Sequence, residues 1–98
     1  MICVKLHRGH DGRSVLAACD EDVIGCSYSQ GKLRLKVNES FYKEDHVSES
    51  EFIVMMKDAD IMNLVGETTI SLAISEGYVD KVNVITIGGM VHAQVVKG

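Results

Sequence analysis

A pair of glycines between two apolar runs is the feature that most restricts the fold of this chain. Residues 82–87 and 90–97 are rich in valine and isoleucine, and Gly88-Gly89 separates them. Two glycines in this position are typical of a tight β-hairpin turn, because its central residues need positive φ. The two-residue turn then predicts three facing cross-strand pairs: Ile87 with Met90, Ile85 with His92, and Asn83 with Gln94.

One face of the predicted hairpin gathers hydrogen-bonding side chains. Because side chains alternate along a strand, the six residues of these three cross-strand pairs share one face. The other face is predicted to carry Val84, Thr86, Val91, Ala93 and Val95. Two carboxamides and an imidazole (Asn83, Gln94, His92) beside an apolar strip form a candidate site for a ligand or a nucleobase edge. The alternative is that they only hydrogen-bond a neighbouring strand or face solvent.

A second candidate site lies on a strand predicted at residues 32–37. Strict alternation directs Leu33, Leu35 and Val37 to the core. The opposite face of this strand is predicted to carry Lys32, Arg34 and Lys36. A row of cations suits the phosphates of RNA, although a solvated strand face that discourages edge-to-edge aggregation has the same pattern.

The charge balance differs between the two halves of the chain. Residues 1–43 carry seven basic and five acidic side chains, whereas residues 44–98 carry three basic and nine acidic ones. Such asymmetry can mark a surface that binds anions. The total of −4 excludes a strongly basic nucleic-acid binder.

The rest of the chain predicts strands first and helices in the middle. Strands at residues 2–7 and 14–19 flank a glycine-containing turn. Ser48 and Glu51 form a capping box ahead of a helix near 49–57. A second helix is predicted from Asp58 or Asp60 to Glu76, although Gly66 inside it costs up to ~1 kcal/mol relative to alanine. This order predicts one α+β domain over residues 1–98, with a mainly antiparallel sheet and two helices packed on one face.

Asn63 and Glu67 would lie one turn apart on the polar side of this second helix, as a candidate ligand-binding pair. A solvated helix face would look the same. The histidines and cysteines match no zinc spacing, and no phosphate-binding glycine loop is present. We therefore expect no metal, no cofactor and no recognisable catalytic residue, while a Cys–His nucleophile pair brought together by the fold stays open.

The cysteine pattern and the N-terminal residues indicate the compartment. Cys3, Cys19 and Cys26 form no C-x-x-C motif, so reduced thiols in the cytoplasm are expected. The first eight residues alternate and carry charge at Lys5, unlike the apolar core of a signal peptide. No apolar run approaches the ~20 residues needed to cross a membrane, so no membrane partner is expected.

With these segments defined, the sequence resembles an archaeal family of small proteins known as domain of unknown function 424. The similarity rests on four motifs: Val4–Arg8, Asn63–Glu67, Ala73–Asp80 and Ile87–Val95. The resemblance implies an archaeal cytosolic protein and supplies no reaction or ligand. Its motifs include Asn63, Glu67, His92 and Gln94, which the residue patterns had already singled out.

Three functions stay open at this point. The first is a binding module for RNA or a ribosome-associated protein in translation, based on the basic strand and the polar hairpin. The second is a protein–protein adaptor or homo-oligomer that presents the apolar strip of Ile85, Ile87 and Met90. The third is a small enzyme with His92 as general base and Glu67 nearby, for which 98 residues leave little room for a deep pocket.

Overall fold

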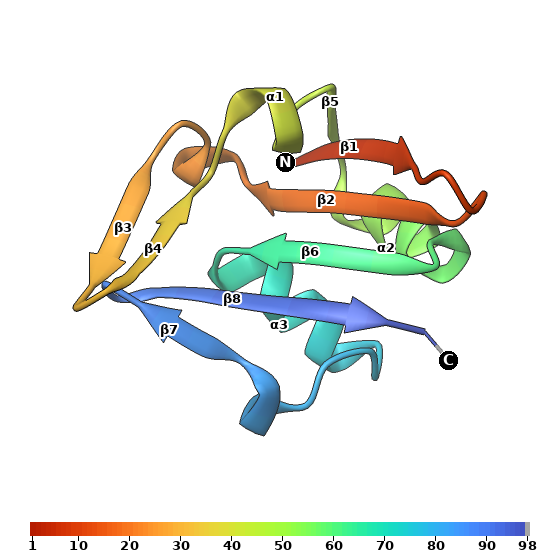
Figure 1. Cartoon of the computed structure of the whole chain (residues 1–98). Coiled ribbons are helices and arrows are strands. Elements are labelled where there is room, and N and C mark those ends of the chain that lie inside the picture. Colours follow the sequence, from red (N-terminus) through yellow and green to blue (C-terminus); the bar gives the residue numbers. More distant parts are fainter. Residues whose placement is uncertain (98) are drawn as a thin grey trace.

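The computed structural model describes residues 1–97 (Figure 1). Strands, helices and two short 3-10 turns (η) follow one another in this order: β1 Ile2–Arg8, β2 Ser14–Asp20, η1 Glu21–Val23, β3 Ser27–Gln30, β4 Leu33–Lys36, α1 Glu39–Tyr42, β5 Asp45–Val47, α2 Glu49–Asp58, β6 Ile61–Val65, α3 Glu67–Ser75, η2 Lys81–Asn83, β7 Ile85–Ile87 and β8 Met90–Val96.

Six strands form one mixed sheet in the order β5-β1-β2-β6-β8-β7, and β3 pairs with β4 in a separate hairpin. The pair β2–β6 is parallel and the other pairs are antiparallel. Helices α2 and α3 cover one face of the sheet, which we call the helix-side face (Figure 1). The opposite, hairpin-side face is covered at one end by α1, η1 and the β3–β4 hairpin. The predicted α+β class, with a mainly antiparallel sheet and two helices on one face, is confirmed.

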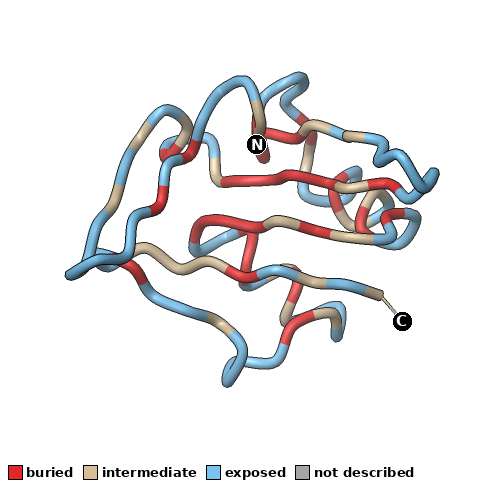
Figure 2. Tube along the Cα trace, viewed as in Figure 1, coloured by how far each residue is buried: buried red, intermediate tan, exposed pale blue. Residues whose placement is uncertain are grey.

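The sheet has an apolar core on each face. Phe52 and Met56 of α2 and Ile70 of α3 pack on the helix-side face. Leu35 of β4 and Tyr42 of α1 close the smaller hairpin-side core. The central strands β2 and β6 are therefore buried along most of their length, as the red segments in Figure 2 show.

The second predicted helix is wrong in its first half, because Ile61–Val65 forms strand β6. This strand pairs with β2 on one side and β8 on the other. Met62 and Leu64 are buried on the helix-side face, and Val65 is buried on the opposite face. A strand buried on both faces is nearly continuously apolar, and a short apolar run cannot be distinguished from a buried helix by its spacing.

The terminal hairpin agrees with the predicted register over its paired residues. Ile85 pairs with His92 and Ile87 pairs with Met90, and both glycines of the turn have positive φ. On the other face, Val95 packs against the helix-side core as expected. The prediction was wrong at the start of the first strand, because residues 81–83 form η2 and no strand pair reaches Asn83.

Other elements also differ from the expectations. Strand β4 is two residues shorter than predicted, and Leu33, expected in the core, is 57% exposed at the hairpin tip. Strands β3 and β5 and helix α1 were not predicted. The capping box at α2 is present, since the Ser48 hydroxyl accepts a bond of 3.2 Å from the Glu51 N–H. None of the helices within residues 1–97 is long and apolar enough to span a membrane.

Candidate functional site

Four of the five predicted ligand-binding residues come together on the hairpin-side face. Asn63 of β6 lies directly opposite Gln94 of β8. Asn83, His92 and Gln94, with Ile85 and Ala93, line a cavity of about 210 Å³ where β7 and β8 separate. We call Asn63, Asn83, His92 and Gln94 the amide–imidazole cluster. The hairpin register predicted the shared face of His92 and Gln94, whereas Asn83 joins them from η2 and not from the paired strand. Asn63 was predicted on a helix beside Glu67 and reaches the cluster from strand β6.

The imidazole of this cluster is oriented by one backbone bond. Nδ1 of His92 lies 2.9 Å from the carbonyl oxygen of Leu64. A carbonyl oxygen can only accept, so the bond requires the proton on Nδ1. In the neutral ring, Nε2 is then left as a hydrogen-bond acceptor. The cluster therefore offers both donors and acceptors, from its carboxamides and this ring.

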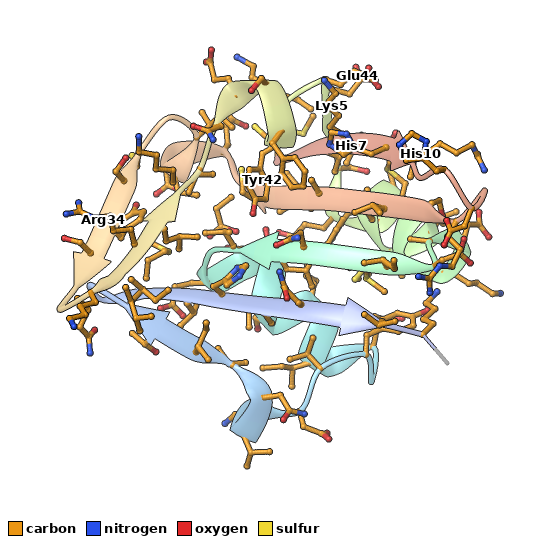
Figure 3. All side chains as sticks on the ribbon, in the orientation of Figure 1. Lys5, His7, His10, Arg34, Tyr42 and Glu44 are labelled. Atoms are coloured by element: carbon orange, nitrogen blue, oxygen red, sulfur yellow. The ribbon has the colours of Figure 1, made fainter. Side chains whose placement is uncertain are left out.

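Tyr42 of α1 adds a hydroxyl that the sequence analysis did not single out. Its Oη donates to Oδ1 of Asn63 at 3.4 Å, and the ring lies over the sheet (Figure 3). Burial raises the pKa of Tyr42 to about 12, so the phenol remains protonated at neutral pH. Two β1 side chains hold α1 in place, because Lys5 donates to the Ser40 carbonyl and His7 bonds the Phe41 carbonyl at 2.8 Å. No sequence signal predicted α1, so its contact with Asn63 was missed.

Glu67 does not join the cluster. It begins α3, directly after Gly66, and it lines two other cavities, of about 510 and 420 Å³. The predicted one-turn spacing between Asn63 and Glu67 is therefore wrong, since the helix starts only at Glu67. The pairing of Glu67 with His92 as an acid–base couple likewise finds no support, because the two side chains line different cavities.

The start of α3 is capped from a distant strand. Asp20, at the end of β2, accepts bonds from the N–H groups of Thr68 and Thr69 at 3.0 and 2.8 Å. The Thr69 hydroxyl, which is fully buried, donates to the same carboxylate at 2.7 Å. A negative charge at this position also complements the helix dipole. Asp20 therefore serves the fold, although it also borders the cavity of about 510 Å³.

The cavity of about 510 Å³ that Asp20 borders is acidic. Its wall includes five carboxylates, from Asp20, Glu21, Asp22, Glu49 and Glu67. Across residues 1–97, no three histidine, cysteine or acidic side chains are arranged to hold a metal ion. The cavity marks an end of the molecule that repels anions.

The three predicted cations lie on a different surface from the amide–imidazole cluster. Lys32, Arg34 and Lys36 are all exposed, and within residues 1–97 none forms an ion pair. Ser27 and Ser29 of β3 pair with Lys36 and Arg34 and share their face. Figure 3 shows Arg34 pointing away from the six-stranded sheet. We call these three cations the basic row.

The apolar strip that the adaptor hypothesis requires is mostly covered. Ile87 is 5% exposed beneath the β3–β4 hairpin, and Met90 packs against the same core. Ile85, at 49% exposure, remains accessible. The hairpin docks here through a close backbone approach, since a Cβ at Gly88 would lie 2.8 Å from the Ser29 carbonyl oxygen.

The mixed sheet, its two covering helices and the docked hairpin define a small α+β protein whose polar features are exposed surfaces and shallow cavities. The profile of a family described as "Protein of unknown function (DUF424)" matches residues 7–97, and the chain belongs to this family. The fold is similar to the crystal structure of an uncharacterized conserved protein from Methanopyrus kandleri. That structure aligns with a TM-score of 0.77 and 21% identity over 99% of this chain and 93% of the other. No curated protein sequence matches the chain.

Proposed function

We propose that this protein is a cytoplasmic module that binds RNA through the basic row on the outer face of the β3–β4 hairpin. The observation that carries the proposal is the geometry of β4. Alternate residues of a strand lie roughly 6.6 Å apart along one face, so Arg34 and Lys36 present two aligned charges on β4. Lys32 was predicted on the same strand, but it lies in the turn that precedes Leu33 and adds a third charge at the hairpin tip. Exposed cations without a carboxylate partner are free to neutralise phosphates.

The distribution of acidic groups limits how RNA can approach. The five carboxylates of the acidic cavity would repel a phosphate backbone, so the RNA has to follow the hairpin and avoid η1 and the start of α3. Phosphate contacts position a nucleic acid without reading its bases. Because Arg34 points away from the sheet, RNA on the basic row stays apart from the amide–imidazole cluster. Binding is therefore expected to depend little on sequence.

The salt dependence of binding tests this proposal. Three phosphate contacts to single-stranded RNA predict a log–log slope of about −2, which is about 20-fold weaker affinity between ~50 and ~200 mM salt. We would measure fluorescence anisotropy with a mixed pool of labelled RNA. Arg34→Glu should weaken all sequences alike and reduce the slope by about 1.

A matched variant separates the basic row from net charge. Lys57→Glu on α2 makes the same change in charge on an exposed residue remote from the hairpin. It should leave most of the affinity intact. Equal losses for Lys57→Glu and Arg34→Glu, or no binding of the parent at low salt, would contradict the proposal.

A further inference from the structure

Strand β8 has a free edge that no other strand of the sheet covers. The strand contains seven residues, but β7 pairs only with the first three, Met90 to His92. Beyond Ile85 the preceding chain turns into η2, and β7 and β8 diverge from their shared turn (Figure 1). The edge of β8 from Gln94 to Val96 therefore lies at the border of the sheet.

The direction of the backbone groups along this edge follows from two hydrogen bonds. The Val91 carbonyl accepts from Gly66, and the Lys97 N–H donates to Asp60, so the odd-numbered residues of β8 face β6. Successive residues of an antiparallel strand point their backbone groups in opposite directions. Gln94 and Val96 therefore direct their N–H and C=O groups to the open side, where no backbone group within residues 1–97 meets them.

A cavity with hydrogen-bonding walls adjoins this edge. The space of about 210 Å³ where β7 and β8 separate is lined by Asn83, His92 and Gln94 on its polar side. It is several times the roughly 30 Å³ that one water occupies in the liquid, so it has room for a side chain. Because Nε2 of His92 is an acceptor in the neutral ring, the cavity favours a side chain that can donate a hydrogen bond.

We infer that β8 binds an extended peptide of a partner protein, which adds as a further strand along Gln94–Val96. Gln94 and Val96 together supply two donors and two acceptors for the new ladder. In strand addition the main chain supplies affinity, and pockets for alternate side chains supply specificity. One side chain of the peptide enters the cavity, and the expected residues there are Asn, Gln, Ser or Thr. This inference is independent of the RNA-binding proposal, which concerns the β3–β4 hairpin.

The size of the edge favours a peptide over a second copy of this chain. A stable dimer of standard size buries about 1,200–2,000 Å² with 20–30 residues from each side. Here two residues offer free backbone groups, and the exposed apolar side chains beside them are Ile85 and Val96. A short peptide segment can form hydrogen bonds with all of these free backbone groups. The row of amides also lacks the positive charge that a nucleic acid would require.

Selection from a random twelve-residue peptide library, displayed on phage, tests the inference. Selected peptides should alternate like a strand and favour a donor side chain at one position. They should bind Val96→Ala as they bind the parent protein, because alanine keeps the N–H. Val96→Pro removes only an N–H that faces outward, so it should weaken binding at least tenfold without loss of the fold. His92→Ala should change the preferred residue at a single peptide position.

N-methylation of the selected peptide gives a second readout that leaves the protein unchanged. Methyl groups at alternate peptide nitrogens should abolish binding, and methyl groups at the intervening nitrogens should be tolerated, because only every second N–H faces β8. Four results would overturn the inference: no enriched peptide, equal sensitivity at all nitrogens, equal binding to Val96→Pro, or a helical spacing in the selected sequences. A dimer in solution that Val96→Pro dissociates, or RNA that competes with the selected peptides, would also overturn it.

Discussion

Replacing Gly66 by alanine should destabilise the protein through two separable effects. The backbone at Gly66 has φ of 111° and ψ of 152°, a region that is open essentially to glycine alone. A Cβ built on Gly66 would also collide with the Asp20 carboxylate that caps α3. The substitution therefore strains the backbone and displaces the cap together.

The magnitude follows from these two terms. Backbone strain of this kind costs about 1–3 kcal/mol. Removing an N-terminal cap costs about 0.5–2 kcal/mol, and the buried hydroxyl of Thr69, left without its acceptor, adds about 1–3 kcal/mol. We therefore expect Asp20→Ala to lower the free energy of unfolding by about 2–4 kcal/mol, and Gly66→Ala, which adds the strain, by about 3–7 kcal/mol. Losses of this size are a large part of the ~5–15 kcal/mol by which domains are stable.

A double-mutant cycle in urea distinguishes the two terms. Once Asp20 is alanine, the new methyl group at position 66 has no carboxylate to displace. Gly66→Ala should then cost only the strain of about 1–3 kcal/mol. The double variant should accordingly be about 2–4 kcal/mol more stable than the sum of the single losses implies, because that sum counts the loss of the cap twice.

Additive losses would refute this reasoning. Distant, independent sites add within roughly 0.3–0.5 kcal/mol, so a coupling energy in that range would mean that Gly66 does not act through Asp20. A loss below about 1 kcal/mol for Gly66→Ala alone would contradict the strain argument as well.

Three further predictions concern thiols, pH and packing. Burial raises the pKa of Cys19 to about 12. Near pH ~8 a thiol-specific dye should therefore react rapidly with the half-buried Cys26 and with Cys19 only after the protein unfolds. Equally fast reaction of the two thiols would contradict the burial of Cys19. The hydrogen bond from the Ser14 N–H lowers the pKa of Asp60 below its ordinary 3.8. The ionised Asp60 carboxylate therefore stabilises the fold above that pH, and this stabilisation is lost as the pH falls through the lowered pKa. The melting temperature of Asp60→Asn should therefore lie below that of the parent at neutral pH, and the two melting temperatures should converge in acid. A difference in melting temperature that does not change with pH would refute this role of the Asp60 carboxylate. Val95→Ala should cost about 1–2 kcal/mol in urea unfolding because Val95 packs on the helix-side core, and equal stability of variant and parent would place its side chain in solvent.

The parts of the fold that the sequence predicted are those governed by local rules. A two-residue turn determines its own register, so the pairs around Gly88-Gly89 could be derived residue by residue. The capping box at Ser48 likewise depends on residues three apart. Only half of the amide–imidazole cluster could be predicted in this way, because His92 and Gln94 lie on the paired hairpin, whereas Asn83 lies in η2 and Asn63 on β6.

The parts that could not be predicted depend on contacts between distant segments. Strand β6 is apolar because two strands and both cores surround it, and none of these neighbours is adjacent in sequence. Strand β3 reads Ser-Tyr-Ser-Gln, with little apolar alternation to mark a strand. Tyr42 gains its role only when α1 is held against β1 by Lys5 and His7. Glu67 was wrongly grouped with Asn63, because the start of α3 after Gly66 is capped by Asp20, a residue of strand β2 that is distant in sequence.

The parallel pairing of β2 with β6 has a consequence for the chain as the ribosome makes it. The β1–β2 hairpin is complete once residue 20 has emerged, and hairpins form in about 1–10 μs. Its partner β6 is finished only at residue 65, and translation at about 5–20 residues per second needs about 2–9 s for that interval. Throughout those seconds the edge of β2 that β6 will occupy stays unpaired, although the elements that cover the hairpin-side face are complete by residue 42. An unpaired strand edge is a template for aggregation, and this one is protected only when residues 61–65 become available to pair with it.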